Sequence, residues 1–351
     1  MWFWEEPLVE RTVSTPRLHV EAQPSGVTVI VPLLPSGLSQ DEQLWAQRTL
    51  LDGLLRQQRP QQIVTWYYTP MALRFSDHIE PVACIYDCMD ELSAFKDAPP
   101  ELTQLEKMLL QRADVVFTGG HSLYAAKRRQ HDNCHAFPSA VDFAHFARAR
   151  DPRTIDPEDQ ASIAHPRVGF FGVIDERMDT ALVEQLAQLR PDVQFVFLGP
   201  VVKIDPASLP TAPNLHWLGV KDYAALPEYL SGWDCGFMPF ALNESTRFIS
   251  PTKTPEFLAA GVPVCSTAIT DVVRPYGREG LVAIASDAAG FSAAIDALLV
   301  DRTARWLQRV DQFLKQVSWD ETWMRMQRLI IQAGADRAAS SDTASKQRKL
   351  G

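Results

Sequence analysis

Short apolar segments that favour β-strands alternate with amphipathic segments that favour helices along most of this 351-residue chain. One apolar segment, 82–87, precedes a helical pattern over 99–112, and another, 168–172, precedes a helical pattern over 180–189. Strands that alternate with helices predict a mostly parallel sheet covered by helices. The fold class predicted from this pattern is α/β.

The alternation is interrupted at 148–165, where Arg, Asp and Pro are frequent and apolar residues are sparse. We place a domain boundary in this segment, because segments of this composition commonly link compact domains. The expected domains are a Rossmann-like N-terminal domain over 1–150 and a Rossmann-like C-terminal domain over 166–334. The remaining residues, 335–351, contain almost no large apolar side chains and predict a disordered tail.

The composition limits the class of function. The formal net charge of −9 argues against a protein that binds nucleic acid by neutralising phosphates. The five cysteines are odd in number and scattered, which favours free thiols in a reducing compartment over a zinc site. No apolar run approaches the roughly 18–20 residues that span a membrane, and the chain starts without a signal-peptide pattern. We therefore expect a cytoplasmic protein.

The segment 250–264 predicts a loop, a short helix, a tight turn and a strand. Ser250 or Thr252 can cap the helix, which has a proline in its first turn and a glycine at its end. A helix N-terminus beside Lys253 favours an anion. Glu256, one turn into the helix, is placed to accept hydrogen bonds from two ribose hydroxyls. The alternative interpretation is an ordinary helix–strand unit with a well-capped helix.

Residues 251–264 read P-T-K-T-P-E-F-L-A-A-G-V-P-V. This stretch resembles the P-x-K-x-x-E-x-x-A-x-G-x-P-V nucleotide-sugar signature of GT-B glycosyltransferases, in particular glycosyltransferase family 4 (group 1) with its teichuronic-acid-type members. The resemblance covers roughly residues 1–330. It implies the GT-B architecture, in which two Rossmann-like doubly wound domains face a cleft.

The family resemblance implies a sugar transfer from a nucleotide diphosphate sugar to a saccharide or lipid-linked acceptor. It further implies a retaining, metal-independent reaction in cell-surface polysaccharide synthesis, with no cofactor beyond the nucleotide-sugar substrate. A lipid-linked acceptor would bring the protein to the inner face of the membrane. Two alternatives remain open: a non-hydrolysing nucleotide-sugar epimerase and a non-catalytic nucleotide-sugar-binding protein.

By the same resemblance, the backbone N–H groups near Thr252 to Thr254 meet the donor diphosphate and Glu256 takes the ribose hydroxyls. Lys253, inside the motif, is expected to contact a phosphate, and Ser250 is a further donor-binding candidate. The sequence departs from the family at one point. Phe248 stands where the family has the first of two glutamates, and the nearby Glu244 is out of register. How the donor sugar is held, and which sugar it is, therefore stays open.

Further candidate donor residues follow the predicted strands of the C-terminal half. Gly172 begins a turn that resembles the family's approach to the donor phosphates, and Arg177 can pair with a diphosphate. Gly219 and Val220 follow a strand that passes the nucleobase in the family. Arg247 can face the donor sugar or phosphate. For each of these residues the alternative is an ordinary surface charge or turn.

The candidate acceptor-side residues follow two strands of the N-terminal half. Asp87 and Asp90 come where the strand 82–87 ends, and either carboxylate can accept or orient the proton of an acceptor hydroxyl. Gly120 and His121 follow the next strand, where glycine permits close backbone approach. The alternatives are a helix cap for Asp90 and a structural role for His121.

The N-terminal half looks short against the family pattern. Residues 2–4 resemble the second strand of a GT-B domain rather than the first. We therefore expect that the first βα unit is missing, and that a chain extended upstream would be more stable or more active.

Overall fold

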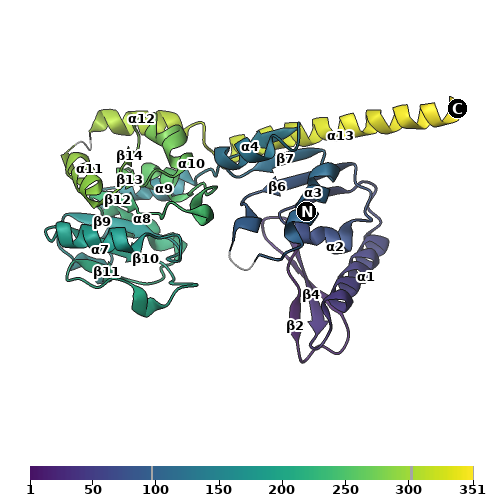
Figure 1. The fold of residues 1–351 in the computed structure, drawn as a ribbon, viewed down its shortest axis with the longest axis horizontal. Helices are drawn as coiled ribbons and strands as arrows, with labels where there is room; N and C mark the ends of the chain where they lie inside the picture. Colours follow the sequence, from purple (N-terminus) through teal and green to yellow (C-terminus); the bar gives the residue numbers. More distant parts are fainter. Residues whose placement is uncertain (96–97, 301–302, 351) are drawn as a thin grey trace. The chain divides into compact units, whose positions relative to one another are not determined.

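The computed structural model describes residues 1–95, 98–300 and 303–350, the last ten of them as backbone only. The chain divides into two compact units (Figure 1). The first unit comprises Met1–Asp87, Pro99–Val115 and Gln332–Gly351, and the second comprises Cys88–Ala98 and Val116–Ile331. Both contain parallel strands and helices, so the predicted α/β class is confirmed.

The first unit begins with a four-stranded sheet. Strands β1 (Trp2–Trp4) and β2 (Leu8–Glu10) both pair in parallel with β4 (Thr28–Pro35), and β3 (Arg17–Ala22) pairs with β4 in antiparallel fashion. The antiparallel pair β3–β4 is a hairpin. Helix α1 (Gln40–Gln58) follows and begins at a capping box, in which the side chains of Ser39 and Glu42 satisfy free backbone N–H groups.

The rest of the first unit is built on two parallel strands, β5 (Val64–Tyr67) and β6 (Ala83–Cys88). Every residue of β6 is buried, as expected for a strand covered on both faces. Helices α2 (Leu73–Ser76) and α3 (Leu102–Arg112) accompany these strands. Trp66 pairs with Ile85 across the two strands. Because side chains alternate between the two faces, this register sets which residues meet beyond the strand ends.

The second unit contains a six-stranded sheet with every neighbouring pair parallel and the order β11-β10-β9-β12-β13-β14. In chain order this is 3-2-1-4-5-6, the order of a doubly wound nucleotide-binding sheet. The strands are β9 (Arg167–Phe171), β10 (Gln194–Leu198), β11 (Leu215–Trp217), β12 (Cys235–Met238), β13 (Val264–Ser266) and β14 (Ala283–Ile284).

Both faces of this sheet are covered. Phe170 belongs to one buried cluster with side chains of α7 (Thr180–Leu189) and α11 (Ala288–Val300). The next residue, Phe171, belongs to the cluster on the opposite face, with α8 (Leu226–Ser231), α9 (Lys253–Ala259) and α12 (Ala304–Leu314). Consecutive strand residues point to opposite faces, so a continuous apolar strand fills two cores. The rigid sheet fixes the loops at its carboxyl edge.

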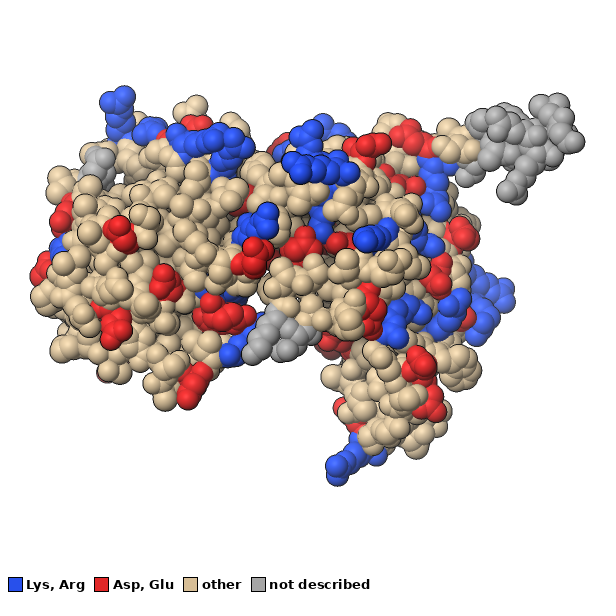
Figure 2. Space-filling view, viewed as in Figure 1, with Lys and Arg blue, Asp and Glu red and all other residues tan. Residues whose placement is uncertain are grey.

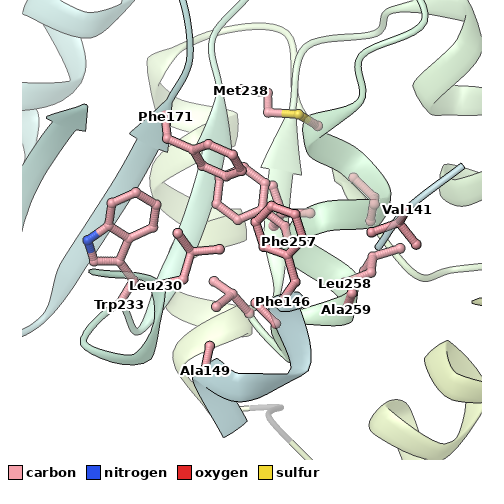
Figure 3. Packing of buried hydrophobic residues seen from close by; sticks show 14 of the residues in the cluster. Val141, Phe146, Ala149, Phe171, Leu230, Trp233, Met238, Phe257, Leu258 and Ala259 are labelled. Carbon is pink, nitrogen blue, oxygen red and sulfur yellow. The ribbon is translucent and has the colours of Figure 1, made fainter. Parts of the chain in front are cut away.

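Residues 116–150 lie in the second unit, although the sequence places them in an N-terminal domain that ends at 150. Figure 3 shows the reason: Phe146 packs into the same core as Phe257 and Trp233. The division by contacts therefore differs from the predicted boundary at 148–165. The polar break is real in the sequence, but it lies within a packed unit. The elements concerned are β7 (Val115–Thr118), α4 (His121–Lys127), β8 (Cys134–Ala136), α5 (Phe143–Ala147) and α6 (Glu158–Ala161).

The last helix, α13 (Trp319–Leu350), continues through the segment that was expected to be a disordered tail. The prediction of disorder is wrong for the backbone of residues 335–350, and Gly351 lies outside the described residues. The physical reason is composition: Ala is the most frequent residue of this segment, and Ala, Arg and Lys have high intrinsic helix propensity.

The surface carries both signs of charge. In Figure 2, acidic and basic side chains are interspersed over each unit. Within residues 1–95, 98–300 and 303–350, no helix is long and apolar enough to cross a membrane.

Candidate functional site

Three glycines follow neighbouring strands at the carboxyl edge of the second unit's sheet. Gly172, Gly199 and Gly219 have φ angles of 134°, 140° and 71°, a region that side chains rarely adopt. The N–H of Gly172 donates to Leu198 O at 2.9 Å, and that of Gly199 donates to Gly219 O at 2.8 Å. A Cβ on Gly199 would lie 1.8 Å from the carbonyl oxygen of Gly172. The edge is thus bare backbone, which a ligand can approach closely. Gly199 was missed by the sequence analysis.

Lys253 lies against the first of these turns. A Cβ on Gly172 would lie 2.7 Å from Lys253 Cε. The Lys253 ammonium is 5.7 Å from the ring centre of Phe171 and donates to Thr252 Oγ1 at 3.2 Å. The structure therefore brings together Gly172 and Lys253, which the sequence assigned separately to the donor phosphates. A positive charge beside bare backbone suits an anion.

The start of helix α9 differs from the expectation. Thr252 precedes the helix in a helical conformation (φ −57°, ψ −26°) and makes no capping hydrogen bond, so the predicted cap by this residue is wrong. A capping side chain needs an extended backbone at that position. Thr254 is fully buried, with its hydroxyl 3.7 Å from Met238 Sδ, so only its backbone can serve a ligand. Gly261 ends the segment with φ 72°, as predicted.

Glu256 is a buried carboxylate with an unsatisfied oxygen. Its Oε2 atom has no hydrogen-bond partner among the described residues. Burial raises the pKa of Glu256 to about 7, although the charge of Lys253 opposes the shift. Tyr223 lies near Glu256. Burial raises the pKa of the Tyr223 hydroxyl, and the negative charge of Glu256 raises it further. An unsatisfied buried acceptor costs about 1–3 kcal/mol, which a hydroxyl donor from a ligand would recover.

Arg177 is held by a neighbour. Its guanidinium donates to both oxygens of Asp175 at 2.7–3.0 Å, and Asp175 is 3% exposed. Arg177 also lies near Asp90, whose pKa burial raises and the arginine charge lowers. The structure therefore brings the predicted phosphate ligand Arg177 close to the predicted acceptor-side Asp90.

Asp90 lines a small hollow of the second unit. The other lining residues come from the loop after β6 and from the segment before α9: Glu91, Ala94, Phe95, Glu244, Ser245, Phe248 and Ile249. Phe248, which stands in place of the family's first glutamate, therefore faces the same hollow as Glu244. Glu91 pairs at 2.8 Å with Lys127, whose side chain is 2% exposed. The sequence analysis missed this buried pair, which anchors the loop that carries Asp90.

Arg247 and Val220 are exposed. Arg247 has a side chain 63% exposed and lies 3.5 Å from Glu244 and 5.1 Å from the ring centre of Phe248. Val220 is 68% exposed, and a Cβ on Gly219 would meet no atom within 4 Å. Both positions are therefore open to a ligand, and the contacts of Arg247 lie on the exposed surface.

Gly120 is required for packing. A Cβ on Gly120 would lie 2.1 Å from Asp271 Oδ2 and 2.9 Å from Ser250 Cβ. Asp271 is buried and accepts hydrogen bonds from the Ser122 N–H and hydroxyl, both at 2.9 Å. The first turn of α4 is thus capped by a carboxylate from α10 (Thr270–Val272). His121 is exposed on this turn, and Asp271 is a residue that the sequence analysis missed.

Asp87 lies in the first unit and is 4% exposed. The indole N–H of Trp66 donates to Asp87 Oδ2 at 3.1 Å, and Oδ1 has no hydrogen-bond partner among the described residues. Burial raises the pKa of Asp87 to about 6, and the Trp66 hydrogen bond opposes this shift. A carboxylate with a raised pKa and a free oxygen has the properties of a general base. Sequence analysis found Asp87 but not Trp66.

No group of three or more His, Cys, Asp or Glu side chains within the described parts of the chain could hold a metal ion. All five cysteines are buried.

Residues 165–301 match the family model described as Glycosyl transferases group 1. This is the part of the chain that carries the glycine turns, Lys253 and Glu256. A curated relative from Bacillus subtilis (strain 168) bears the provisional name teichuronic acid biosynthesis glycosyltransferase TuaH. It is 26% identical over 236 residues, which cover 61% of this chain and 58% of the relative. The match thus spans little more than half the length of that relative.

Solved structures share the fold along nearly the whole chain. A UDP-forming α,α-trehalose-phosphate synthase from Burkholderia xenovorans, in complex with glucose-6-phosphate, gives a TM-score of 0.65 at 13% identity, over 94% of this chain and 92% of that one. HepE from Anabaena, in complex with UDP and glucose, gives a TM-score of 0.58 at 14% identity, over 89% and 86%. At these identities the likeness establishes the fold.

The chain therefore has the fold of GT-B proteins, and the part of its second unit over residues 165–301 is similar to group 1 glycosyl transferase domains. The predicted GT-B fold class is confirmed. Among proteins of this class, the similarity to TuaH agrees with the predicted resemblance to teichuronic-acid-type members.

Proposed function

We propose that this protein transfers a sugar from a nucleotide diphosphate sugar to a hydroxyl of a saccharide or lipid-linked acceptor, in cell-surface polysaccharide synthesis. The observation that carries the proposal is the cluster at the carboxyl edge of the second sheet. There Lys253 lies against the bare turn at Gly172, and Glu256 keeps one buried oxygen without a partner among the described residues. Ligands of doubly wound sheets bind at this edge.

Each residue of the cluster has a distinct part in the proposed reaction. Lys253 and the backbone at Gly172 hold the diphosphate and offset the negative charge that grows on it as the bond to the sugar breaks. Glu256 accepts hydrogen bonds from the ribose hydroxyls, which satisfies its free oxygen. Gly219 and Val220 leave space for the nucleobase. Arg177 and Arg247 stay candidates for the donor phosphate or sugar.

On the acceptor side, we propose that Asp87 orients the acceptor hydroxyl and takes its proton. Asp90, Gly120 and His121 stay candidates for contacts with the acceptor. Retention of configuration and independence from metal follow from the family resemblance alone. A cytoplasmic location, and association with the inner face of a membrane through a lipid-linked acceptor, are proposed on the same ground.

The test is a melting-temperature panel with UDP, ADP and GDP, because a ligand that binds the folded state raises its apparent stability. We expect a selective rise with one nucleotide, and Glu256→Ala should abolish it. Glu184→Ala, an exposed carboxylate on α7, is the matched control and should keep the rise. A well-folded protein that responds to none of the nucleotides would refute the donor site.

One observation favours a second candidate, a protein that binds nucleotide sugars without turnover. Phe248 faces the hollow where the family pattern has a glutamate. A melting shift with nucleotide sugars, combined with no release of nucleotide in the presence of saccharides, would support this alternative.

A further inference from the structure

Two aromatic residues near the end of strand β5 in the first unit are assigned by neither the sequence pattern nor the family resemblance: Trp66 within the strand and Tyr68 directly after it. Trp66 pairs with Ile85 of β6 in the parallel ladder. Because strand side chains alternate, Trp66 shares one face of the pair with Ile85 and with Asp87, two residues further along β6. Tyr68 follows directly after the end of β5. The carboxylate of Asp87 therefore lies on the face that carries the Trp66 ring, and Tyr68 contacts that ring.

Side-chain contacts agree with this placement. Trp66 donates its indole N–H to Asp87 Oδ2 at 3.1 Å. The ring centres of Trp66 and Tyr68 lie 6.3 Å apart, with an angle of 39° between the ring planes, and the ring centre of Phe3 lies 6.3 Å from that of Tyr68. Tyr68 is 49% exposed, whereas Asp87 is 4% exposed. The aromatic surface thus leads from solvent to the buried carboxylate.

The second observation is the unsatisfied oxygen of Asp87. Oδ1 is buried and has no hydrogen-bond partner among the described residues, although the same carboxylate is anchored through Oδ2. Buried acceptors are nearly always satisfied, so an exception requires an explanation. A hydroxyl donor supplied by a ligand provides one, and the exposed ring beside it is suited to the apolar face of a sugar.

We propose that Trp66, Tyr68 and Asp87 form an acceptor subsite that takes a hydroxyl-rich sugar ring. The ring packs on Tyr68, and one of its hydroxyls donates to Asp87 Oδ1. Trp66 is a positioning residue, because its N–H fixes Oδ2 and leaves Oδ1 for the substrate. Since Oδ1 is enclosed, the side chains around it have to move before the hydroxyl can reach it. This proposal rests on the glycosyltransferase function proposed above and adds the part that recognises the acceptor.

In the transfer, the acceptor oxygen held there forms its bond to the anomeric carbon of the donor sugar. The bond from that carbon to the diphosphate oxygen breaks, and the nucleotide diphosphate leaves with the electron pair. The hydroxyl proton passes to the Asp87 carboxylate. No oxidant or metal is needed for this balance.

The experiment is saturation-transfer NMR with the methyl glycosides of glucose, galactose, N-acetylglucosamine and glucuronic acid at millimolar concentration. We expect at least one of them to bind and to shift the ¹³C signal of the Asp87 carboxyl. Tyr68→Ala should weaken that binding by about fivefold or more, and Tyr68→Phe should preserve it, because the ring provides the contact. Trp66→Phe, which keeps a ring but loses the N–H, should weaken binding by about threefold to tenfold.

Trp45→Ala removes an exposed aromatic residue of α1 in the same unit and should change nothing. The subsite is refuted if no glycoside binds the wild-type protein, or if Tyr68→Ala binds like the wild type. Melting shifts with nucleotides, measured in the same samples, separate the two proposals. A Glu256-dependent nucleotide shift without a Tyr68-dependent glycoside signal would remove the acceptor subsite alone, and loss of the nucleotide shift in the wild type would remove the donor function.

Discussion

Asp87 in the first unit and Glu256 in the second are two buried carboxyls that share an unsatisfied oxygen but have different neighbours. Each has one oxygen without a hydrogen-bond partner among the described residues. Burial raises the pKa of Asp87 to about 6 and that of Glu256 to about 7. Both therefore ionise close to neutral pH, where a ligand can change their protonation at little cost.

Their surroundings differ in charge. Asp87 is anchored by the neutral indole of Trp66, which fixes its direction without neutralising it. Glu256 has Lys253 nearby, but the ammonium donates to Thr252 and lies over Phe171, so burial still dominates the shift. A carboxylate held by a neutral donor keeps its basicity and suits proton transfer. A carboxylate beside a cation suits binding of a ligand that carries hydroxyls and phosphates together.

The largest effect is expected from Gly199→Val. This substitution changes the backbone of the proposed donor site, to which Glu256 belongs. Gly199 has φ 140°, and its Cβ would lie 1.8 Å from a carbonyl oxygen. Strain and overlap together should destabilise the protein by more than about 3 kcal/mol in urea unfolding, and the nucleotide shift should vanish.

The matched control is Gly53→Ala in α1, where a Cβ meets no atom within 4 Å. It should be neutral or stabilise by about 0.5–1 kcal/mol, because alanine is the better helix former. If Gly199→Val kept wild-type stability and nucleotide binding, a glycine at position 199 would not be required for the fold or for the proposed donor site.

The next largest effect is expected from Asp87→Asn, which changes the proposed acceptor-side carboxyl of the first unit. The amide keeps the shape but cannot take a proton, so the rate of sugar transfer should fall by about 10²–10⁴-fold. Nucleotide melting shifts should stay at the wild-type value, since Glu256 and Lys253 are untouched. Steady-state nucleotide release with an acceptor saccharide measures both variants, and Glu6→Gln, an exposed carboxyl of the same unit, serves as the control.

Undiminished turnover in Asp87→Asn would contradict the general-base assignment. The two carboxyls would then be alike, both structural or both binding groups, and the contrast between a neutral and a charged neighbour would have no functional meaning.

Local patterns in the sequence were enough for most of the fold. The capping box before α1, the glycine after α9 and the apolar strands β6 and β9 are local signals that need no tertiary knowledge. The same holds for Glu256, which lies within a short signature.

The residues that were missed depend on distant partners. Trp66 reaches Asp87 only through the register of β5 on β6, and Asp271 meets Ser122, 149 positions away. Residues 116–150 join the second unit because Phe146 packs on Phe257, which the polar break after them does not reveal. The helix over residues 335–350 was not predicted, because this segment has few large apolar side chains, although many of its residues have high helix propensity.

The smallest effect is a pH dependence of stability, and it separates the two carboxyls most sharply. Each pKa is higher in the folded protein than the ordinary value, 3.8 for Asp87 and 4.5 for Glu256. Folding therefore favours the protonated forms: their stabilisation is complete below the ordinary pKa and is lost as the pH rises through about 6 and about 7. Each carboxyl should lower the free energy of unfolding by about 2–3 kcal/mol between about pH 4 and pH 8. Urea unfolding of Asp87→Asn and Glu256→Gln at several pH values, compared with the wild type, separates the contribution of each carboxyl from those of the other titrating groups. Added nucleotide should reduce the pH dependence of stability that Glu256 contributes and leave that of Asp87 unchanged, because ribose hydroxyls stabilise the ionised Glu256 carboxylate. An equal effect of nucleotide on both contributions would contradict the separate roles of the two carboxyls.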